Sequence, residues 1–131
     1  MIVEYIEPQR CKVISEYLTR YLPSSDAKTH LLSALAPDTN VHHYIVRDLR
    51  GVAGAISFTV YKNRVNVFNL GSVVKGGGTL LMEQVERIAF MNDKSVTLLA
   101  TPGSINFYLK RGFKMVGKHT PGGVTMSKGP K

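Results

Sequence analysis

The sequence predicts an α/β (α+β) fold, in which a mixed, mostly antiparallel sheet of about six or seven strands carries helices on both faces. The hydrophobic period switches between strand-like alternation and helical spacing in the order β-α-α-β-β-β-α-β-α-β-β. In the middle of the chain a strand, a glycine-rich segment, a helix and a strand follow one another, which is the order of a parallel crossover. The 131 residues suffice for one hydrophobic core, so a single domain over residues 1–131 is expected.

One strand and two helices are predicted in the first third of the chain. Residues 1–6 are rich in β-branched and aromatic side chains and end before Pro8, which predicts a strand. The next segment has apolar residues at helical spacing, and Pro23 ends it. These apolar residues are Val13, Ile14, Tyr17, Leu18 and Tyr21. Ser24 or Ser25 then suits the N-cap of a second helix. The apolar stripe of that helix consists of Leu31, Leu32 and Leu35.

Three strand-like runs follow, at residues 42–49, 52–61 and 65–70. Residues 50–51 and 62–64 are short enough to be turns between them. Because short turns join antiparallel neighbours, the three runs predict an antiparallel meander.

The second half of the chain is predicted to begin with a long helix after the glycines. Its apolar face consists of Leu81, Val85, Ile88 and Ala89. Residues 95–100 are almost wholly apolar and are expected to form a strand buried on both faces. Ser104 suits the cap of a short helix that runs through Lys110. Residues 114–119 and 124–128 then predict a closing hairpin.

The charge balance is strongly basic. Lysine and arginine number 17 against 9 acidic residues, which gives a net charge of +8, and Asp93 is the last acid. Seven cations follow it, namely Lys94, Lys110, Arg111, Lys114, Lys118, Lys128 and Lys131. Such a field favours an anionic partner, which can be nucleic acid, an acidic membrane surface or a polyphosphate cofactor. The alternative is that the lysines only keep the protein in solution.

Cysteine content and apolar run lengths exclude several classes of protein. The single Cys11 cannot form an internal disulfide, which suits a cytoplasmic location, and zinc ribbons or fingers would need clustered ligands, so no metal site is expected. The longest apolar-leaning run, residues 51–60, is far short of the roughly 20 residues that span a membrane. Residues 1–4 lack the pattern of a signal peptide. No membrane partner is therefore expected.

The first candidate binding segment comprises residues 71–79. Three consecutive glycines let a ligand approach the backbone closely, and they open a helix whose free N–H groups attract anions. Lys75 adds a positive charge, so the segment suits a phosphate. Neither nucleotide motif fits, because no lysine follows the glycines as in a P-loop and Leu81 replaces the third glycine of the dinucleotide fingerprint. The alternative is a flexible turn.

A second motif completes a pattern with the first. Residues 76–82 read Gly-Gly-Gly-Thr-Leu-Leu-Met, and residues 107–113 read Phe-Tyr-Leu-Lys-Arg-Gly-Phe, with a helix and a strand between them. The first resembles the acyl-coenzyme A binding segment of the GCN5-related N-acetyltransferase (GNAT) superfamily, and the second resembles that family's Phe-Tyr-x-Lys-x-Gly-Phe signature. The resemblance covers about residues 52–113 and extends to the termini only by element order. Compact members with a contracted glycine loop occur among phage-encoded proteins, so the resemblance leaves a phage origin open.

The resemblance implies an N-acetyltransferase with acetyl-CoA as its cofactor. A primary amine of an acceptor that the sequence does not identify would attack the acetyl group directly in a ternary complex. The cofactor-binding residues that the resemblance implies are Leu70, Val74, Lys75, Gly76, Gly77, Gly78, Thr79, Thr101, Phe107, Lys110 and Arg111. The sequence departs from the family at Val73, where Gln or Arg is usual, and at Thr101, where Asn is usual.

The resemblance also implies the catalytic residues. Tyr108 matches the family's tyrosine that protonates the leaving thiolate, and a phenol with a pKa of about 10 is protonated at neutral pH. Many members use a glutamate as the general base, but residues 64–74 contain no acid. Asn69 or Ser72 is expected to order a water that carries the amine proton away. The adjacent pair His42-His43 has a suitable pKa, and a solvated or structural role is the alternative for each.

A different class of function remains open from the sequence alone. The fold could serve as a catalytically weakened binding module for RNA or protein, which the missing base and Val73 favour and the intact Tyr108 opposes. Lys114, Lys118, Lys128 and Lys131 have no assigned role, and an acidic acceptor is expected there. A monomer and a homodimer are both compatible with the sequence, and the expected location is the cytoplasm, the host's if the protein is phage-encoded.

Overall fold

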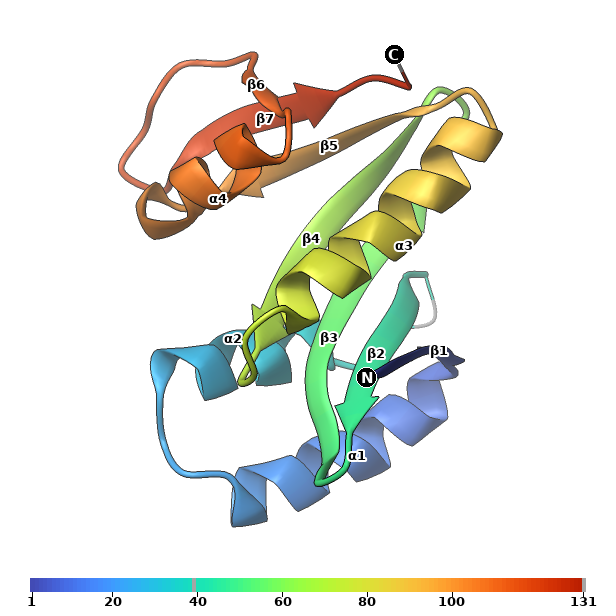
Figure 1. Ribbon diagram of the computed structural model, residues 1–131, viewed down its shortest axis with the longest axis vertical. Coiled ribbons are helices and arrows are strands. Elements are labelled where there is room, and N and C mark those ends of the chain that lie inside the picture. The colour runs from blue at the N-terminus through green and yellow to red at the C-terminus, as the bar shows by residue number, and fades with distance from the viewer. Residues whose placement is uncertain (39, 131) are drawn as a thin grey trace. The chain divides into compact units, whose positions relative to one another are not determined.

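The structure is a computed structural model, and it describes residues 1–38 and 40–130 (Figure 1). Within these residues it has a seven-stranded sheet, in the order β1-β2-β3-β4-β5-β7-β6, and four α-helices. β4 and β5 are parallel, and the pairs β1–β2, β2–β3, β5–β7 and β6–β7 are antiparallel. The predicted α+β fold with a mixed, mostly antiparallel sheet is confirmed.

The elements fall in two compact units. The strands are β1 (Ile2–Ile6), β2 (His42–Asp48), β3 (Gly51–Val60), β4 (Arg64–Ser72), β5 (Ser95–Ala100), β6 (Lys114–Met115) and β7 (Val124–Lys128). The helices are α1 (Pro8–Tyr21), α2 (Asp26–Ala34), α3 (Gly77–Met91) and α4 (Ile105–Lys110), and a 3-10 turn, η1, spans Pro102–Ser104. The first unit comprises Met1–Thr59 and Phe68–Gln84, and the second comprises Val60–Val67 and Val85–Lys131. The single domain over residues 1–131 stays a prediction.

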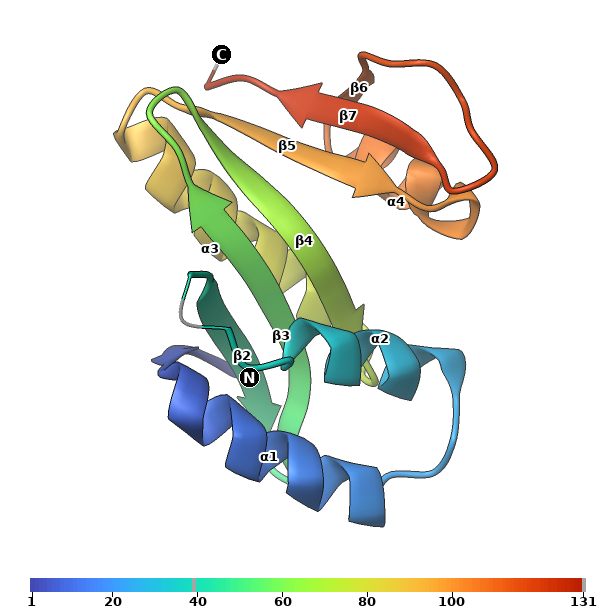
Figure 2. The same ribbon diagram turned by 180° about the vertical axis from the view of Figure 1, so that it is seen from behind.

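The first unit has helices on both faces of its strands (Figures 1 and 2). Ile45 of β2 and Ala55 of β3 are paired, and both belong to the buried cluster that α1 and α2 complete. The helical members of this cluster are Cys11, Leu18, Leu31 and Ala34. Val46 follows Ile45 and therefore points to the other face. There its Cγ1 would lie 3.3 Å from a Cβ placed on Gly77, at the start of α3.

The connection between α1 and α2 is fixed by hydrogen bonds. The Ser25 hydroxyl accepts a hydrogen bond from the Lys28 N–H at 3.0 Å, so Ser25, one of the two serines predicted for this position, is the N-cap of α2. The Lys28 ammonium donates to the carbonyl oxygens of Thr19 at 3.0 Å and Leu22 at 2.8 Å. One lysine thus ties the start of α2 to the end of α1.

β5 differs from its prediction in burial. Val96, Leu98 and Ala100 are buried, but Leu99 is 60% exposed. The prediction that this strand is buried on both faces is therefore wrong. An apolar run in a strand shows which side chains are compatible with burial, but whether a second layer covers the other face depends on the rest of the fold.

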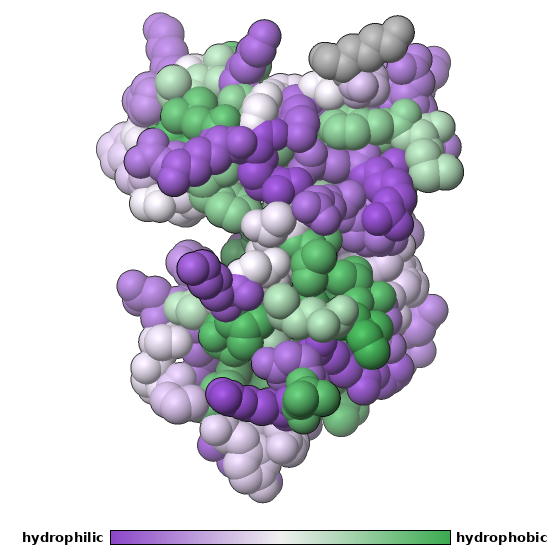
Figure 3. Space-filling model, viewed as in Figure 1, coloured by the Kyte–Doolittle hydropathy of each residue, from purple (hydrophilic) through white to green (hydrophobic). Residues whose placement is uncertain are grey.

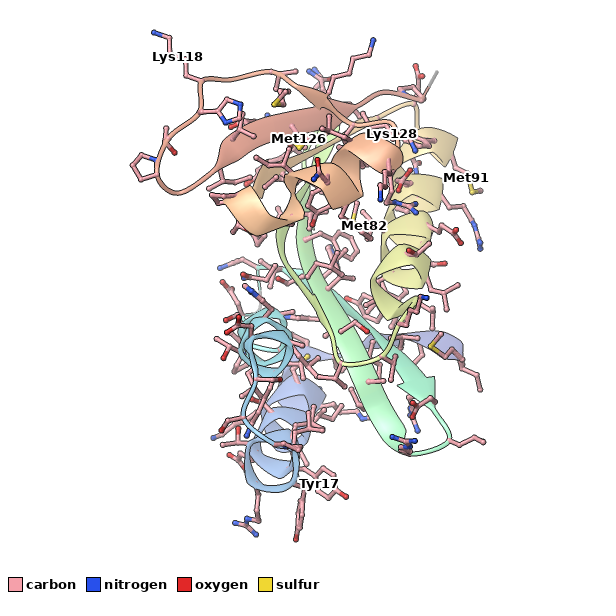
Figure 4. The ribbon with its side chains drawn as sticks, turned by 60° about the vertical axis from the view of Figure 1, so that its left-hand side comes forward. Tyr17, Met82, Met91, Lys118, Met126 and Lys128 are labelled. Carbon is pink, nitrogen blue, oxygen red and sulfur yellow. The ribbon has the colours of Figure 1, made fainter. Side chains whose placement is uncertain are left out.

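The closing hairpin is shorter than predicted. The predicted strand at residues 114–119 is wrong beyond Met115, although the Val116 N–H still donates to the Thr125 carbonyl at 2.9 Å. Met115 and Val116 are 46% and 61% exposed, so little burial supports a longer strand. Figure 4 shows Lys118 at the outer end of the segment between β6 and β7, with its side chain directed away from the sheet.

The surface mixes hydrophobic and hydrophilic residues on the face shown in Figure 3. Leu49, Met91 and Leu99 are among the exposed large hydrophobic side chains. Among the described residues, no helix combines the length and the apolar character that a membrane crossing requires.

Candidate active site

The glycine segment is shorter in the structure than residues 71–79. β4 continues through Ser72, and the Val73 N–H donates to the Ala53 carbonyl at 2.8 Å. α3 begins at Gly77. The connection between strand and helix is therefore only residues 73–76, and the remaining glycines belong to the first turn of α3.

Three positions of this region suit glycine, each for a separate physical reason. A Cβ on Gly71 would lie 2.2 Å from the backbone nitrogen of Leu31, so the absence of a side chain lets α2 lie against β4. Gly76 has a φ of +86°, a conformation that glycine adopts readily. A Cβ on Gly77 would lie 2.2 Å from the hydroxyl oxygen of Ser72. The close contact of Gly71 with α2 was not foreseen from the sequence, because nothing local to Gly71 indicates it.

Ser72, predicted as a catalytic residue, holds the turn into α3. Its hydroxyl oxygen lies 2.8 Å from the Val74 carbonyl oxygen and 3.3 Å from the Ala53 carbonyl oxygen, and it accepts a hydrogen bond from the Val74 N–H at 3.2 Å. The side chain is half-buried. These bonds give Ser72 a positioning role in the described structure.

The turn leaves a group of backbone donors free. Four backbone N–H groups near the start of α3 have no acceptor within residues 1–38 and 40–130. They belong to Lys75, Gly76, Gly78 and Thr79. The intervening Gly77 N–H donates to the Val74 carbonyl at 3.3 Å. Free N–H groups at the positive end of a helix form a concave site for an anion. Lys75 is exposed beside them, so this place can hold a phosphate group.

Tyr108 is buried in the second unit. Its ring packs edge-on against Phe107 and Phe113, with centroid distances of 5.0 Å and 5.5 Å. Burial raises the pKa of Tyr108 to about 12, although the nearby Arg111 acts in the opposite direction. The phenol is therefore protonated throughout the neutral range. It can donate a hydrogen bond to a ligand.

Two of the cations singled out in the sequence are paired in a buried ion cluster. The carboxylate of Glu86, which is 5% exposed, lies 2.6 Å from Nη2 of Arg111 and 2.5 Å from Nζ of Lys128. Nζ of Lys128 also lies 5.8 Å and 6.0 Å from the ring centroids of Phe90 and Phe113. Figure 4 shows Lys128 on β7. Since Glu86 lies outside the apolar stripe of its helix, the sequence did not indicate that it is buried.

The other cations and hydroxyls of the second motif are placed as follows. Lys110 is exposed and Phe107 is half-buried. The side-chain oxygens of Thr101 and Ser104 lie 2.6 Å apart, and the Ser104 hydroxyl also donates to the Thr101 carbonyl at 3.2 Å. Ser104 therefore makes no side-chain cap for α4, and that prediction is wrong. Lys114 and Lys118 are exposed, and Lys131 lies outside the described residues.

A pocket beside α2 collects polar side chains from several elements, and we call it the α2 pocket. Its volume is about 230 Å³. It is lined by Ser33, Ala36, Asp38, Val41, Ser57, Phe68 and Asn69. Asn69, predicted as a catalytic residue, is exposed and belongs to this pocket. Leu70 and Val74 are half-buried.

The adjacent histidines have opposite environments, because consecutive strand residues point to opposite faces of the sheet. His42 is exposed, and its Nδ1 lies 2.9 Å from the Tyr5 hydroxyl oxygen. His43 is fully buried, and its Nε2 lies 3.2 Å from the Ala36 carbonyl oxygen. Burial lowers the pKa of His43. Its Nδ1 is buried and has no hydrogen-bond partner among the described residues.

Comparison with known proteins relates the chain to enzymes by structure. No family model and no curated protein sequence matches it. Among solved structures, the PaiA N-acetyltransferase from Thermoplasma acidophilum in complex with coenzyme A has a TM-score of 0.69 at 14% identity, covering 98% of this chain and 99% of that chain. The ribosomal-protein-S18-alanine N-acetyltransferase from Escherichia coli has a TM-score of 0.70 at 13% identity, over 99% and 94% of the chains.

An acetyltransferase with a different acceptor has the same fold. Aminoglycoside 6'-N-acetyltransferase, solved with coenzyme A, has a TM-score of 0.67 at 16% identity, covering 100% of this chain and 98% of that chain. These similarities show that the chain has the fold of the GCN5-related N-acetyltransferases, as the resemblance of its two motifs predicted.

Proposed function

We propose that the protein is an N-acetyltransferase that transfers an acetyl group from acetyl-CoA to a primary amine of its acceptor. The observation that carries this proposal is the group of free N–H donors of Lys75, Gly76, Gly78 and Thr79 at the start of α3. Donors in this arrangement suit a pyrophosphate. The similarly folded PaiA was solved with coenzyme A, which supports the same class of cofactor here.

The proposed cofactor residues divide by the part of the molecule that they would hold. The backbone of residues 75–79, with the side chains of Lys75 and Thr79, would bind the pyrophosphate. The other cofactor contacts that the family motif implies would be made by Thr101, Phe107 and Lys110. Arg111 is already paired with Glu86, so we assign it instead to holding the end of α4 in place.

The proposed chemistry uses the chain's own donors. Bound acetyl-CoA would supply an activated acetyl thioester. The backbone N–H of Leu70 would donate to the carbonyl oxygen as negative charge develops on it. Tyr108 would donate a hydrogen bond to the leaving sulfur. Asn69 keeps its proposed role of ordering a water near the amine, and Ser72 is proposed to act through the turn that it holds.

Thermal unfolding tests the cofactor. Acetyl-CoA at 100 times its Kd should stabilise the protein by about 2.7 kcal/mol, which raises the melting temperature. Lys75→Ala should reduce this rise, whereas Lys118→Ala, an exposed control with the same charge change, should not. An unchanged melting temperature with acetyl-CoA would contradict the proposal. A rise with single-stranded RNA in its place would favour the binding-module alternative.

We also propose a cytoplasmic location. Cys11, the sole cysteine of the chain, is fully buried, and burial raises the pKa of its thiol to about 11. With no second cysteine the chain cannot form an internal disulfide, which suits a reducing compartment.

A further inference from the structure

The short helix α4 depends on contacts with other elements to hold its position. It has only six residues, and isolated helices of this length are marginal in water. Its start lacks a side-chain cap, because Ser104 makes no such hydrogen bond. Tyr108, the proposed donor to the leaving sulfur, lies in this helix. The contacts that fix α4 therefore decide where the phenol lies.

The carbonyl oxygen of Tyr108 joins α4 to the turn that follows it. This oxygen accepts hydrogen bonds from the N–H groups of Arg111 at 3.0 Å and Phe113 at 3.1 Å. The buried ring of Phe113 packs edge-on against the ring of Tyr108, with centroids 5.5 Å apart. A shift of residues 111–113 would therefore move Tyr108 as well.

The carboxylate of Glu86, from α3, holds this turn in place. Its Oε2 accepts two hydrogen bonds from the Arg111 guanidinium, from Nε at 3.2 Å and from Nη2 at 2.6 Å. Its Oε1 accepts one from the Lys128 ammonium at 2.5 Å. Nζ of Lys128 lies 6.0 Å from the centroid of the Phe113 ring, and its Cε would lie 3.4 Å from a Cβ on Gly112. One carboxylate thus connects α3, β7 and the turn after α4.

Stability alone does not explain a buried ion cluster at this place. Apolar side chains of similar volume are often as stabilising as a buried ion pair, because the charges lose their hydration. A guanidinium that donates two hydrogen bonds to a carboxylate adds a fixed orientation, which an apolar contact does not provide. The cluster is therefore suited to fix the geometry of the turn after α4.

We propose that Glu86 is a positioning residue of the acetyl-transfer site, which holds Tyr108 in place through Arg111 and Lys128 so that the phenol reaches the leaving sulfur. This role rests on the proposed function. Glu86 acts through its neighbours and not on the substrate itself. Its pairing also explains why a cation within the second motif is kept from a cofactor phosphate.

A double-mutant cycle in kcat tests whether Glu86 acts through the phenol. Thiol release from acetyl-CoA is followed with an excess of glycinamide as the probe amine. Glu86→Gln should lower kcat roughly tenfold, because a catalytic group displaced by about 1 Å loses much of its effect. In a Tyr108→Phe background the same change should alter kcat less than about twofold, since no hydroxyl remains to be misplaced. Glu83→Gln, an exposed control with the same charge change on α3, should leave kcat unchanged.

The position of the phenol also has a readout that needs no turnover. In the unliganded protein with ring-¹³C-labelled tyrosine, the Tyr108 signal is identified by its absence from Tyr108→Phe. Glu86→Gln should shift this signal, because the packing of the two rings changes, and should leave that of Tyr44 in place. Lys128→Gln keeps Glu86 and Arg111 as a neutral pair, so it should give a smaller shift, and it replaces Glu86→Gln in both experiments if that variant does not fold.

Three results would overturn the inference. They are an unmoved Tyr108 signal, an equal loss of kcat with and without the phenol hydroxyl, and a loss of acetyl-CoA affinity as large as the loss of kcat. A displaced Tyr108 signal in a protein that neither binds nor turns over acetyl-CoA would contradict the proposed function, while it would confirm that Glu86 holds the phenol.

Discussion

Tyr108 shows how burial alters the role that a motif assigns to a side chain. A free tyrosine has a pKa of about 10, and burial raises that of Tyr108 to about 12. A thiol has a pKa of about 8.5, so complete proton transfer from this phenol to a thiolate is uphill. The side chain is better suited to stabilise the leaving sulfur through a hydrogen bond while keeping its proton.

Replacing Tyr108 by phenylalanine tests this role. The loss of a hydrogen bond to a charged group should lower kcat by roughly 10- to 100-fold and leave the Kd of acetyl-CoA unchanged. Since the phenol stays protonated to about pH 12, the wild type and the variant should have the same pH dependence of kcat/KM between pH 7 and 10. Steady-state thiol release and cofactor titration measure both quantities. An equal loss of kcat and of cofactor affinity would assign Tyr108 to binding instead.

Glu86 supplies a second prediction at this scale. Glu86→Gln removes the charge that pairs with Arg111 and Lys128, whose side chains are 15% and 27% exposed. Leaving two partly buried cations unpaired should lower the free energy of unfolding by about 2–3 kcal/mol. Urea unfolding measures the loss, with the exposed Glu83→Gln as control. If both variants prove equally stable, the cluster does not contribute to stability.

The helices and strands were largely predictable because their signals are local. Ser25 caps α2 and the meander strands occur where alternation and short turns placed them. The predicted glycine segment was too long. Gly71 and Ser72 continue β4, and residue type alone does not show where a strand ends. Leu99 and Val116 are exposed because no second layer covers them, a property of the assembled sheet.

Gly71 gives a prediction for the packing of two elements. In Gly71→Ala the new methyl group would lie 2.2 Å from the backbone nitrogen of Leu31, and the backbone of α2 would have to shift. The free energy of unfolding should fall by about 1–3 kcal/mol or more. Gly103→Ala is the matched control, because a Cβ there meets nothing within 4 Å. Denaturant unfolding of both variants measures the difference, and equal stabilities would show that α2 accommodates the methyl group.

At the scale of the whole molecule, fewer cations are free to attract an anionic partner than the composition suggests. Lys128 and Arg111 are counted in the net charge of +8, yet both are paired with Glu86, whose single negative charge offsets one of them. The motifs predicted the glycine segment and Tyr108 because their residues are close in sequence. The α2 pocket was not predictable in this way, since Ser33, Ser57 and Asn69 come from three separate elements and only the fold brings them together.

The unfolding of the whole chain tests the prediction of a single domain. β4 and α3 each contribute residues to both compact units, so neither unit can unfold without breaking an element that it shares with the other. We expect one cooperative transition in urea. Methyl signals of Leu31 in the first unit and Met126 in the second should report the same midpoint, and Gly71→Ala and Glu86→Gln should each lower both midpoints equally. Separate midpoints, or a variant that shifts the signal of its own unit alone, would show that the chain consists of two independently folding parts.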